Sequence, residues 1–199
     1  MLVEKTLNRS IRRRLGLVAG ALAMSLVSAS SMAAIIYSGP VNIVIPDGID
    51  GLYMNVVTGA TSTAAPPPAN WDINPYSALA GQFNLWGPTT NTWFTTSGAI
   101  AGPYNLPVGT SVTGAATAFF RPGGSTDLAS QLNLNSSNNY LGFRFTNEAA
   151  GGAINFGWLQ LQVGATAAVR SIIAYAYEDS GAAIPVGTTP VSLQNFSVD

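Results

Sequence analysis

Three segments in the second half of the chain combine β-branched and aromatic residues with short connections. They read Tyr140-Leu-Gly-Phe-Arg-Phe145, Ile154-Asn-Phe-Gly-Trp-Leu-Gln-Leu-Gln-Val163 and Arg170-Ser-Ile-Ile-Ala-Tyr-Ala-Tyr177. Residues of these types favour strands, and a polar, glycine-containing turn at 147–152 separates the first two segments. Consecutive strands joined by short loops predict an antiparallel meander.

Alternation along these segments predicts which side chains face the core. Successive side chains of a strand point to opposite faces, so Leu159, Leu161 and Val163 share one face, which we expect to be buried. Trp158, in the middle of the same segment, is expected in the core as well. The predicted meander therefore supplies much of the hydrophobic core.

The third segment predicts a strand that is covered on both sides. Uninterrupted alternation places Ile172 on the same face as Ala174 and Ala176. Tyr175 and Tyr177 occupy the other face, so apolar or aromatic residues are present on both.

Upstream of the meander, short apolar segments alternate with Gly, Pro, Asn and Ser clusters. Residues 41–45 predict a strand, the turn at Pro46-Asp47-Gly48 follows, and residues 51–57 predict the returning strand of a hairpin. The proline-containing stretch 58–70 predicts an exposed loop. No longer window has the period of an amphipathic helix, so the fold class we predict is all-β, an antiparallel β-sandwich of the jelly-roll-like kind.

The N-terminal residues have the three parts of a secretory signal peptide. A basic region containing Lys5 and Arg12 to Arg14 precedes an apolar run at 15–27 and a small-residue stretch that ends at Ala33. The apolar run is short of the roughly 20 residues that span a membrane, which disfavours the alternative of a transmembrane anchor. We predict a signal peptide at 1–33, cleavage after Ala33, and a single secreted domain at 34–199 with no membrane span.

Charge and composition exclude several classes of function. Residues 34–199 contain three arginines, no lysine and eight acidic residues, a net charge of −5. Such a chain has no basic patch for nucleic acid or an anionic membrane. The sequence contains no histidine and no cysteine, which removes the usual catalytic triads, histidine- or thiolate-bound zinc and disulfides. The chain is therefore predicted not to be an enzyme.

A block near the C-terminus resembles a recurring module of exported proteins of Gram-negative bacteria. The block comprises Tyr140-Leu-Gly-Phe-Arg-Phe145, Phe156-Gly-Trp-Leu-Gln-Leu161, Ile173-Ala-Tyr-Ala-Tyr-Glu178 and Gly181-Ala-Ala-Ile184. Many proteins of that type carry a PEP-CTERM sorting anchor, whereas this sequence stops at Asp199, shortly after Phe196, without one. The resemblance implies a place outside the cell, on the surface or in the periplasm, and implies no chemistry.

Three tryptophans are candidate ligand-binding residues. Trp71, Trp86 and Trp93 fall in the loop-rich middle of the chain, where flat aromatic faces can stack on sugar rings. The alternative is that these side chains fill the core of the sandwich, as large aromatics of β-sandwiches usually do. We favour the core interpretation and keep a sugar-binding surface, with an extracellular polysaccharide as its ligand, as the competing hypothesis.

Carboxylates provide two further candidate sites. Asp47 and Asp50, three residues apart on a glycine-rich loop, are candidate ligands of calcium, although Asp-Gly is also common hairpin-turn chemistry. Glu148, Glu178 and Asp179 are candidates for the carboxylate pair of a glycosidase, against the alternative that they solvate turns. No cofactor other than calcium is predicted.

One arginine in the meander requires an explanation. Arg144 lies in an otherwise apolar segment, and we predict that it pairs with Glu178 across neighbouring strands.

These observations favour a secreted, non-enzymatic structural or interaction protein that forms a matrix or filament. Sparse charge and the absence of lysine leave strand edges without the residues that usually prevent edge-to-edge association, so self-association is expected. A carbohydrate-binding module is the alternative, and a carboxylate-dependent glycosidase ranks last.

Overall fold

The computed structural model describes residues 34–77, 82–89, 92–95, 105–115, 119–121, 125–126 and 132–190, with side chains undescribed at 119–121 and 125–126. All of these residues belong to one unit, Met32–Asp199. The predicted signal peptide at 1–33 lies outside the described residues.

The predicted meander is confirmed and forms the centre of the fold. Its strands are β11 (Ser136–Asn147), β12 (Ala153–Val163) and β13 (Arg170–Glu178), and β12 pairs antiparallel with both of the others. The turn between β11 and β12 is a 3-10 helix, η2 (Glu148–Ala150), which the Asn147 side chain caps by accepting a hydrogen bond from the N–H of Ala150. Gly151 closes this turn with φ of 70°, a backbone conformation that glycine adopts without strain.

Shorter strands extend the central sheet on both sides. The order is β1-β13-β12-β11-β7-β9, with β1 (Ile35–Tyr37), β7 (Trp93–Thr95) and β9 (Phe119–Arg121). Strand β2 (Ile43–Val44) also pairs with β13, so the predicted hairpin between residues 41–45 and 51–57 is wrong. The N-terminal segment instead runs antiparallel along β13, which offers a longer apolar partner than residues 51–57.

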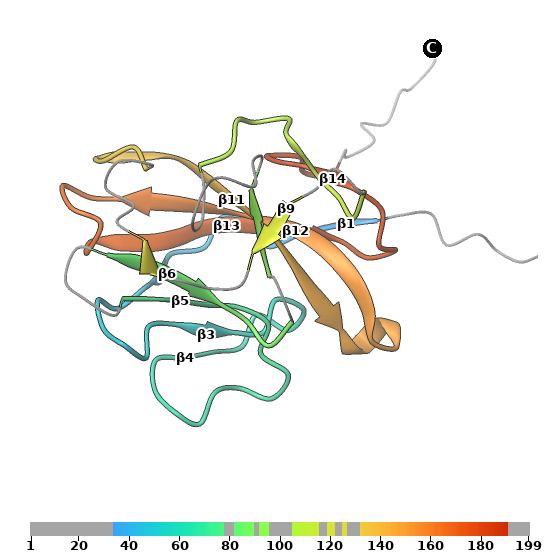
Figure 1. Ribbon diagram of the computed structural model, residues 1–199, viewed down its shortest axis with the longest axis horizontal. Coiled ribbons are helices and arrows are strands. Elements are labelled where there is room, and N and C mark those ends of the chain that lie inside the picture. Colours follow the sequence, from blue (N-terminus) through green and yellow to red (C-terminus); the bar gives the residue numbers. More distant parts are fainter. Residues whose placement is uncertain are drawn as a thin grey trace, which may run out of the picture. The chain divides into compact units, whose positions relative to one another are not determined.

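Three smaller antiparallel sheets complete the fold. They are formed by β5 (Asn74–Tyr76), β6 (Phe83–Trp86) and β10 (Ser125–Thr126); by β3 (Tyr53–Met54) and β4 (Thr61–Ser62); and by β8 (Ser111–Val112) and β14 (Ile184–Pro185). Figure 1 shows β3 to β6 in a layer beside β11 to β13. Every strand pair of the described chain is antiparallel, which confirms the all-β antiparallel sandwich.

Both faces of the meander are buried. Leu159, Leu161 and Val163 lie in one cluster with the side chains of β3 and β6, as predicted. Trp158 is 1% exposed and belongs to a second cluster on the opposite face, together with residues of β8 and β14. The predicted core positions are therefore confirmed, and β12 contributes to both clusters.

A β-bulge in β13 changes the predicted alternation of side chains. The register passes from Gln160 opposite Ala174 to Leu161 opposite Ile172, so Ile173 has no partner in β12. An extra residue reverses the parity beyond it, and Ile172 joins Tyr175 in the first cluster instead of Ala174 in the second. The predicted face of Ile172 was wrong for this reason.

A glycine in β12 allows the closest packing of the sheet. Gly157 lies between Phe143 and Tyr177 in the strand register, and a Cβ atom there would meet the Phe143 ring and lie 2.7 Å from the carbonyl oxygen of Ala176. We expect Gly157→Ala to lower the free energy of unfolding by about 1–3 kcal/mol through overpacking. Urea denaturation measures this change.

Gly48 provides the matched control for this substitution. Its added Cβ would meet no atom within 4 Å, so Gly48→Ala is expected to leave stability within about 0.5 kcal/mol of wild type. Equal stability of the two variants would contradict the packing argument.

Candidate functional site

Three aromatic side chains meet at the surface of the small sheets. The ring centroids of Trp71 and Trp86 are 5.1 Å apart with planes inclined at 53°, and Tyr53 meets Trp71 edge-on at 5.1 Å. Trp86 is 48% exposed, while Tyr53 and Trp71 are partly exposed. We call these three residues the aromatic cluster. The structure thus brings together two of the three tryptophans predicted from the sequence and adds Tyr53.

Buried polar side chains hold Trp71 in place. The Asn55 amide donates hydrogen bonds to the carbonyl oxygens of Ala69 (3.2 Å) and Asn70 (2.6 Å), just before Trp71. The residue after it, Asp72, accepts a hydrogen bond from the N–H of Val56 at 2.7 Å. The exposed loop that precedes Trp71 is therefore fastened at its end to the turn after β3.

Strand pairing positions the other two members of the cluster. Tyr53 lies in β3 opposite Ser62, and Trp86 is the last residue of β6, opposite Asn74. The Asn74 side chain is buried and donates a hydrogen bond to the carbonyl oxygen of Asp50 at 2.8 Å. Strand pairing thus holds the backbone that carries Tyr53 and Trp86.

The third predicted tryptophan is not at the surface. Trp93 is 1% exposed, and its ring packs against Phe143 with centroids 6.3 Å apart. β7 pairs with β11 in the central sheet, which places this side chain in the first core cluster. The assignment of Trp93 to a sugar-binding surface is therefore wrong.

Asp72 is a buried carboxyl that the sequence did not single out. It is 2% exposed, and burial raises its pKa from 3.8 to about 7. The hydrogen bond from Val56 opposes this rise, and the negative charge of Glu148 adds to it. The only sequence signal is its place after Trp71, because burial of an Asp in a polar loop has no local pattern.

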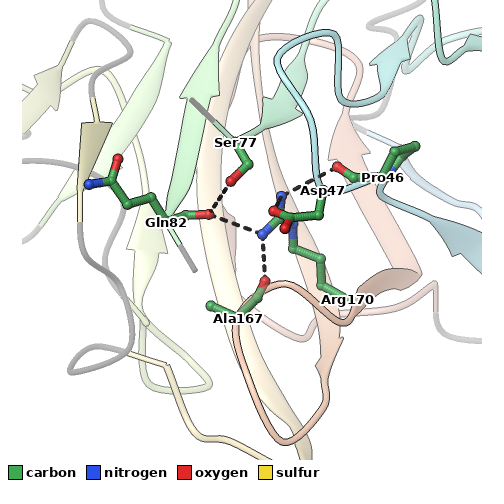
Figure 2. Close-up of polar contacts among 6 residues, drawn as sticks. All are labelled: Pro46, Asp47, Ser77, Gln82, Ala167 and Arg170. Atoms are coloured by element: carbon green, nitrogen blue, oxygen red, sulfur yellow. Dashed lines mark hydrogen bonds and ion pairs between the residues drawn. The ribbon is translucent and has the colours of Figure 1, made fainter. Parts of the chain in front are cut away.

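A buried arginine, Arg170, joins three segments at the start of β13 (Figure 2). The Arg170 guanidinium donates hydrogen bonds to the carbonyl oxygens of Gln82 (3.1 Å), Pro46 (3.4 Å) and Ala167, and it lies 4.7 Å from the centroid of the Phe83 ring. Its side chain is fully buried, and burial lowers the pKa of Arg170 below its usual value while Asp47 opposes that shift. This arrangement is a structural one.

One of the two predicted calcium ligands, Asp47, lies beside this arginine. A carboxylate oxygen of Asp47 is 3.6 Å from the Arg170 guanidinium, so Asp47 already has a cationic partner. The backbone carbonyl of Asp50 accepts a hydrogen bond from the Asn74 side chain, and Asp50 is an exposed residue. No group of three acidic, His or Cys side chains suited to a metal occurs among the described residues. Calcium binding stays a prediction.

The three candidate glycosidase carboxylates differ in exposure and in hydrogen-bond partners. Glu148 is exposed in η2, whereas Glu178 is 3% exposed and accepts a hydrogen bond from the N–H of Ser180. Asp179 accepts one from the N–H of Ala34. Two of the three thus fasten backbone segments.

The predicted ion pair across neighbouring strands is also wrong. Arg144 lies opposite Phe156 in β12, which in turn lies opposite Glu178 in β13. Since β12 separates the two strands, Arg144 and Glu178 are not cross-strand neighbours.

The outer edge of the central sheet is a second candidate surface. β1 and β2 lie end to end along β13, and no strand in the described part of the chain pairs with their other side. Ile36 is 41% exposed and Val44 is 64% exposed. The segment 34–46 contains no charged residue. We call this segment the N-terminal edge.

No protein-family model, curated protein or solved structure matches the chain at a significant level. The resemblance to exported bacterial proteins stays a prediction. Within the described residues, no helix has the length and hydrophobicity that a membrane crossing requires.

Proposed function

We propose that this chain is a secreted, non-enzymatic protein of the bacterial cell exterior that assembles with copies of itself into a matrix or filament. The observation that supports the proposal is the N-terminal edge, an uncharged strand edge whose outer side pairs with no strand of the described chain. Such an edge is a template for another strand unless charges, bulges or a covering segment protect it.

Hydrogen bonding along this edge alternates between its two sides. The N–H groups of Ser38, Val41 and Ile45 bond inward to carbonyl oxygens of β13, at 3.0, 2.8 and 3.1 Å. In an antiparallel pair the intervening residues direct their N–H and C=O groups outward. Ile35, Tyr37, Asn42 and Val44 are the residues at the outward positions.

The charge distribution favours a second copy as the occupant. Two copies of residues 34–199, which carry a net charge of −5, repel each other, and the N-terminal edge is a place where they can meet without like charges facing each other. Antiparallel pairing of two identical edges is also self-complementary, so this edge forms a twofold dimer, and growth of the dimer into a matrix or filament needs a second contact.

The test is size-exclusion chromatography with light scattering over a range of protein concentrations. We expect the average mass to rise with concentration in wild type and Val44→Lys to shift that rise to at least tenfold higher concentration, because a charge then faces its own copy. Thermal melting verifies that the variant is folded.

Val108→Lys is the matched control, because Val108 is 63% exposed and lies outside the N-terminal edge. It is expected to behave as wild type. A wild-type protein that stays monomeric throughout, or an equal effect of the two substitutions, would contradict the proposal.

A further inference from the structure

The aromatic cluster has the features of a ligand site independent of self-association. Trp86 is the one aromatic among the strongly exposed large hydrophobic residues of the described chain, where the others are aliphatic. Its neighbours Trp71 and Tyr53 come from different segments, and the buried side chains of Asn55 and Asp72 fix the segment that carries Trp71. A half-exposed ring on a fixed base is pre-organised for binding, which reduces the entropy lost when a ligand is held.

The inclination of the rings restricts the shape of the ligand. Sugar rings present a flat face of C–H groups that packs on the π-face of an indole. Because the planes of Trp71 and Trp86 are inclined at 53°, the two indoles do not form one flat platform. A ribbon-like chain with coplanar sugar rings can rest on only one of them. A chain that turns between successive sugars can contact both.

The polar surroundings restrict the charge of the ligand. Residues near the cluster include Ser62, opposite Tyr53 in the β3–β4 pair, and the exposed Asn70, immediately before Trp71. Both are neutral; the Ser62 hydroxyl donates to the carbonyl oxygen of Ala64, and the exposed Asn70 amide suits sugar hydroxyls. The sequence that carries the cluster, residues 45–90, contains three aspartates and no lysine or arginine. The lack of basic residues in this stretch, together with the net charge of −5 over residues 34–199, disfavours an acidic polysaccharide.

We propose that the aromatic cluster binds a neutral polysaccharide whose chain bends or coils, with one sugar ring on the exposed face of Trp86 and the adjoining sugar beside Trp71. The ring inclination selects chain shape, and the net negative charge selects against acidic sugars. Self-association through the N-terminal edge would make such binding multivalent, but the site itself does not depend on it.

Calorimetric and tryptophan-fluorescence titrations with defined oligosaccharides test this proposal. The probes are maltohexaose as a coiled neutral chain, cellohexaose as a flat neutral chain, and an oligogalacturonate of similar length as an acidic one. We expect maltohexaose to bind at least tenfold more tightly than either of the others.

Variants then locate the site. Trp86→Ala is expected to weaken maltohexaose binding at least tenfold, Trp86→Phe to weaken it less, and Val169→Ala, at an exposed apolar residue elsewhere, to have no effect. The ring at Trp86 is half exposed, so thermal melting is expected to show folded protein in all three.

Several outcomes would overturn the proposal. They are absence of binding to all three probes, preference for cellohexaose or the acidic chain, and binding unaffected by Trp86→Ala. Repeating the titration with Val44→Lys separates this site from assembly, because sugar binding is expected to persist when self-association is lost.

Discussion

Arg170→Ala is expected to lower the free energy of unfolding by about 3–5 kcal/mol. The substitution removes the donor shared by the carbonyl oxygens of Gln82, Pro46 and Ala167, and it leaves a cavity beside the Phe83 ring. These carbonyls belong to segments far apart in sequence, so loss of the hydrogen bonds to them affects the fold as a whole. Urea denaturation of wild type and variant measures the difference.

Asp47→Asn separates the ion pair from the carbonyl contacts. The Asp47 side chain is 30% exposed and lies 3.6 Å from the guanidinium, so its removal is expected to cost less than about 1 kcal/mol. A cost as large as that of Arg170→Ala would show that the ion pair, and not the carbonyl hydrogen bonds, holds the three segments together.

The meander was predictable because its signals are local. Leu159, Leu161 and Val163 alternate with polar or smaller residues, and a polar turn with glycines precedes their strand. A strand that contributes to two clusters also needs a large apolar residue on its other face, which Trp158 supplies. Burial followed directly from these patterns.

Long-range pairing was not predictable in the same way. Nothing in residues 41–45 indicates a partner more than 120 positions away, and the nearby turn at Asp47-Gly48 favours a local hairpin. The bulge at Ile173 likewise has no glycine or polar residue to mark it. Trp93 and Phe94 stand between threonines in a loop-rich stretch, and the burial of Trp93 depends on the pairing of β7 with β11.

The candidate site was predictable in part, for a related reason. Exposed loops in the middle of the chain indicated Trp71 and Trp86, whereas Tyr53 reaches them only through the packing of β3 beside β5. Asn55 and Asp72 are buried polar residues, and burial of such side chains depends on partners that the sequence alone does not identify.

Stability is expected to fall as pH rises from about 4 to about 7, because Asp72 binds its proton more tightly in the folded protein. Its folded pKa is about 7, against 3.8 for an ordinary Asp. Below pH 4 the group is protonated in both states, so no penalty exists. Between the two values only the unfolded chain loses the proton, and the penalty reaches up to ~4 kcal/mol above pH 7.

Asp72→Asn isolates this contribution. The amide oxygen can still accept the hydrogen bond from Val56, and no charge is buried at any pH. We therefore expect the variant to be more stable than wild type at pH 8 and within about 1 kcal/mol of it at pH 4. Asp50→Asn, at an exposed residue, makes the same change of formal charge and is expected to retain the loss of stability that Asp72 causes between pH 4 and 7.

Glu148→Gln tests the electrostatic part of the same argument. Removing the charge of Glu148 lowers the pKa of Asp72, since that charge raises it, so the fall in stability should end at lower pH. Tyr177 also senses the Asp72 charge, which contributes to its own raised pKa. Urea denaturation between pH 4 and 8 is the measurement. Parallel pH profiles for wild type and Asp72→Asn would mean that the Asp72 carboxyl is solvated in the folded protein and that the segment carrying Trp71 is loosely packed.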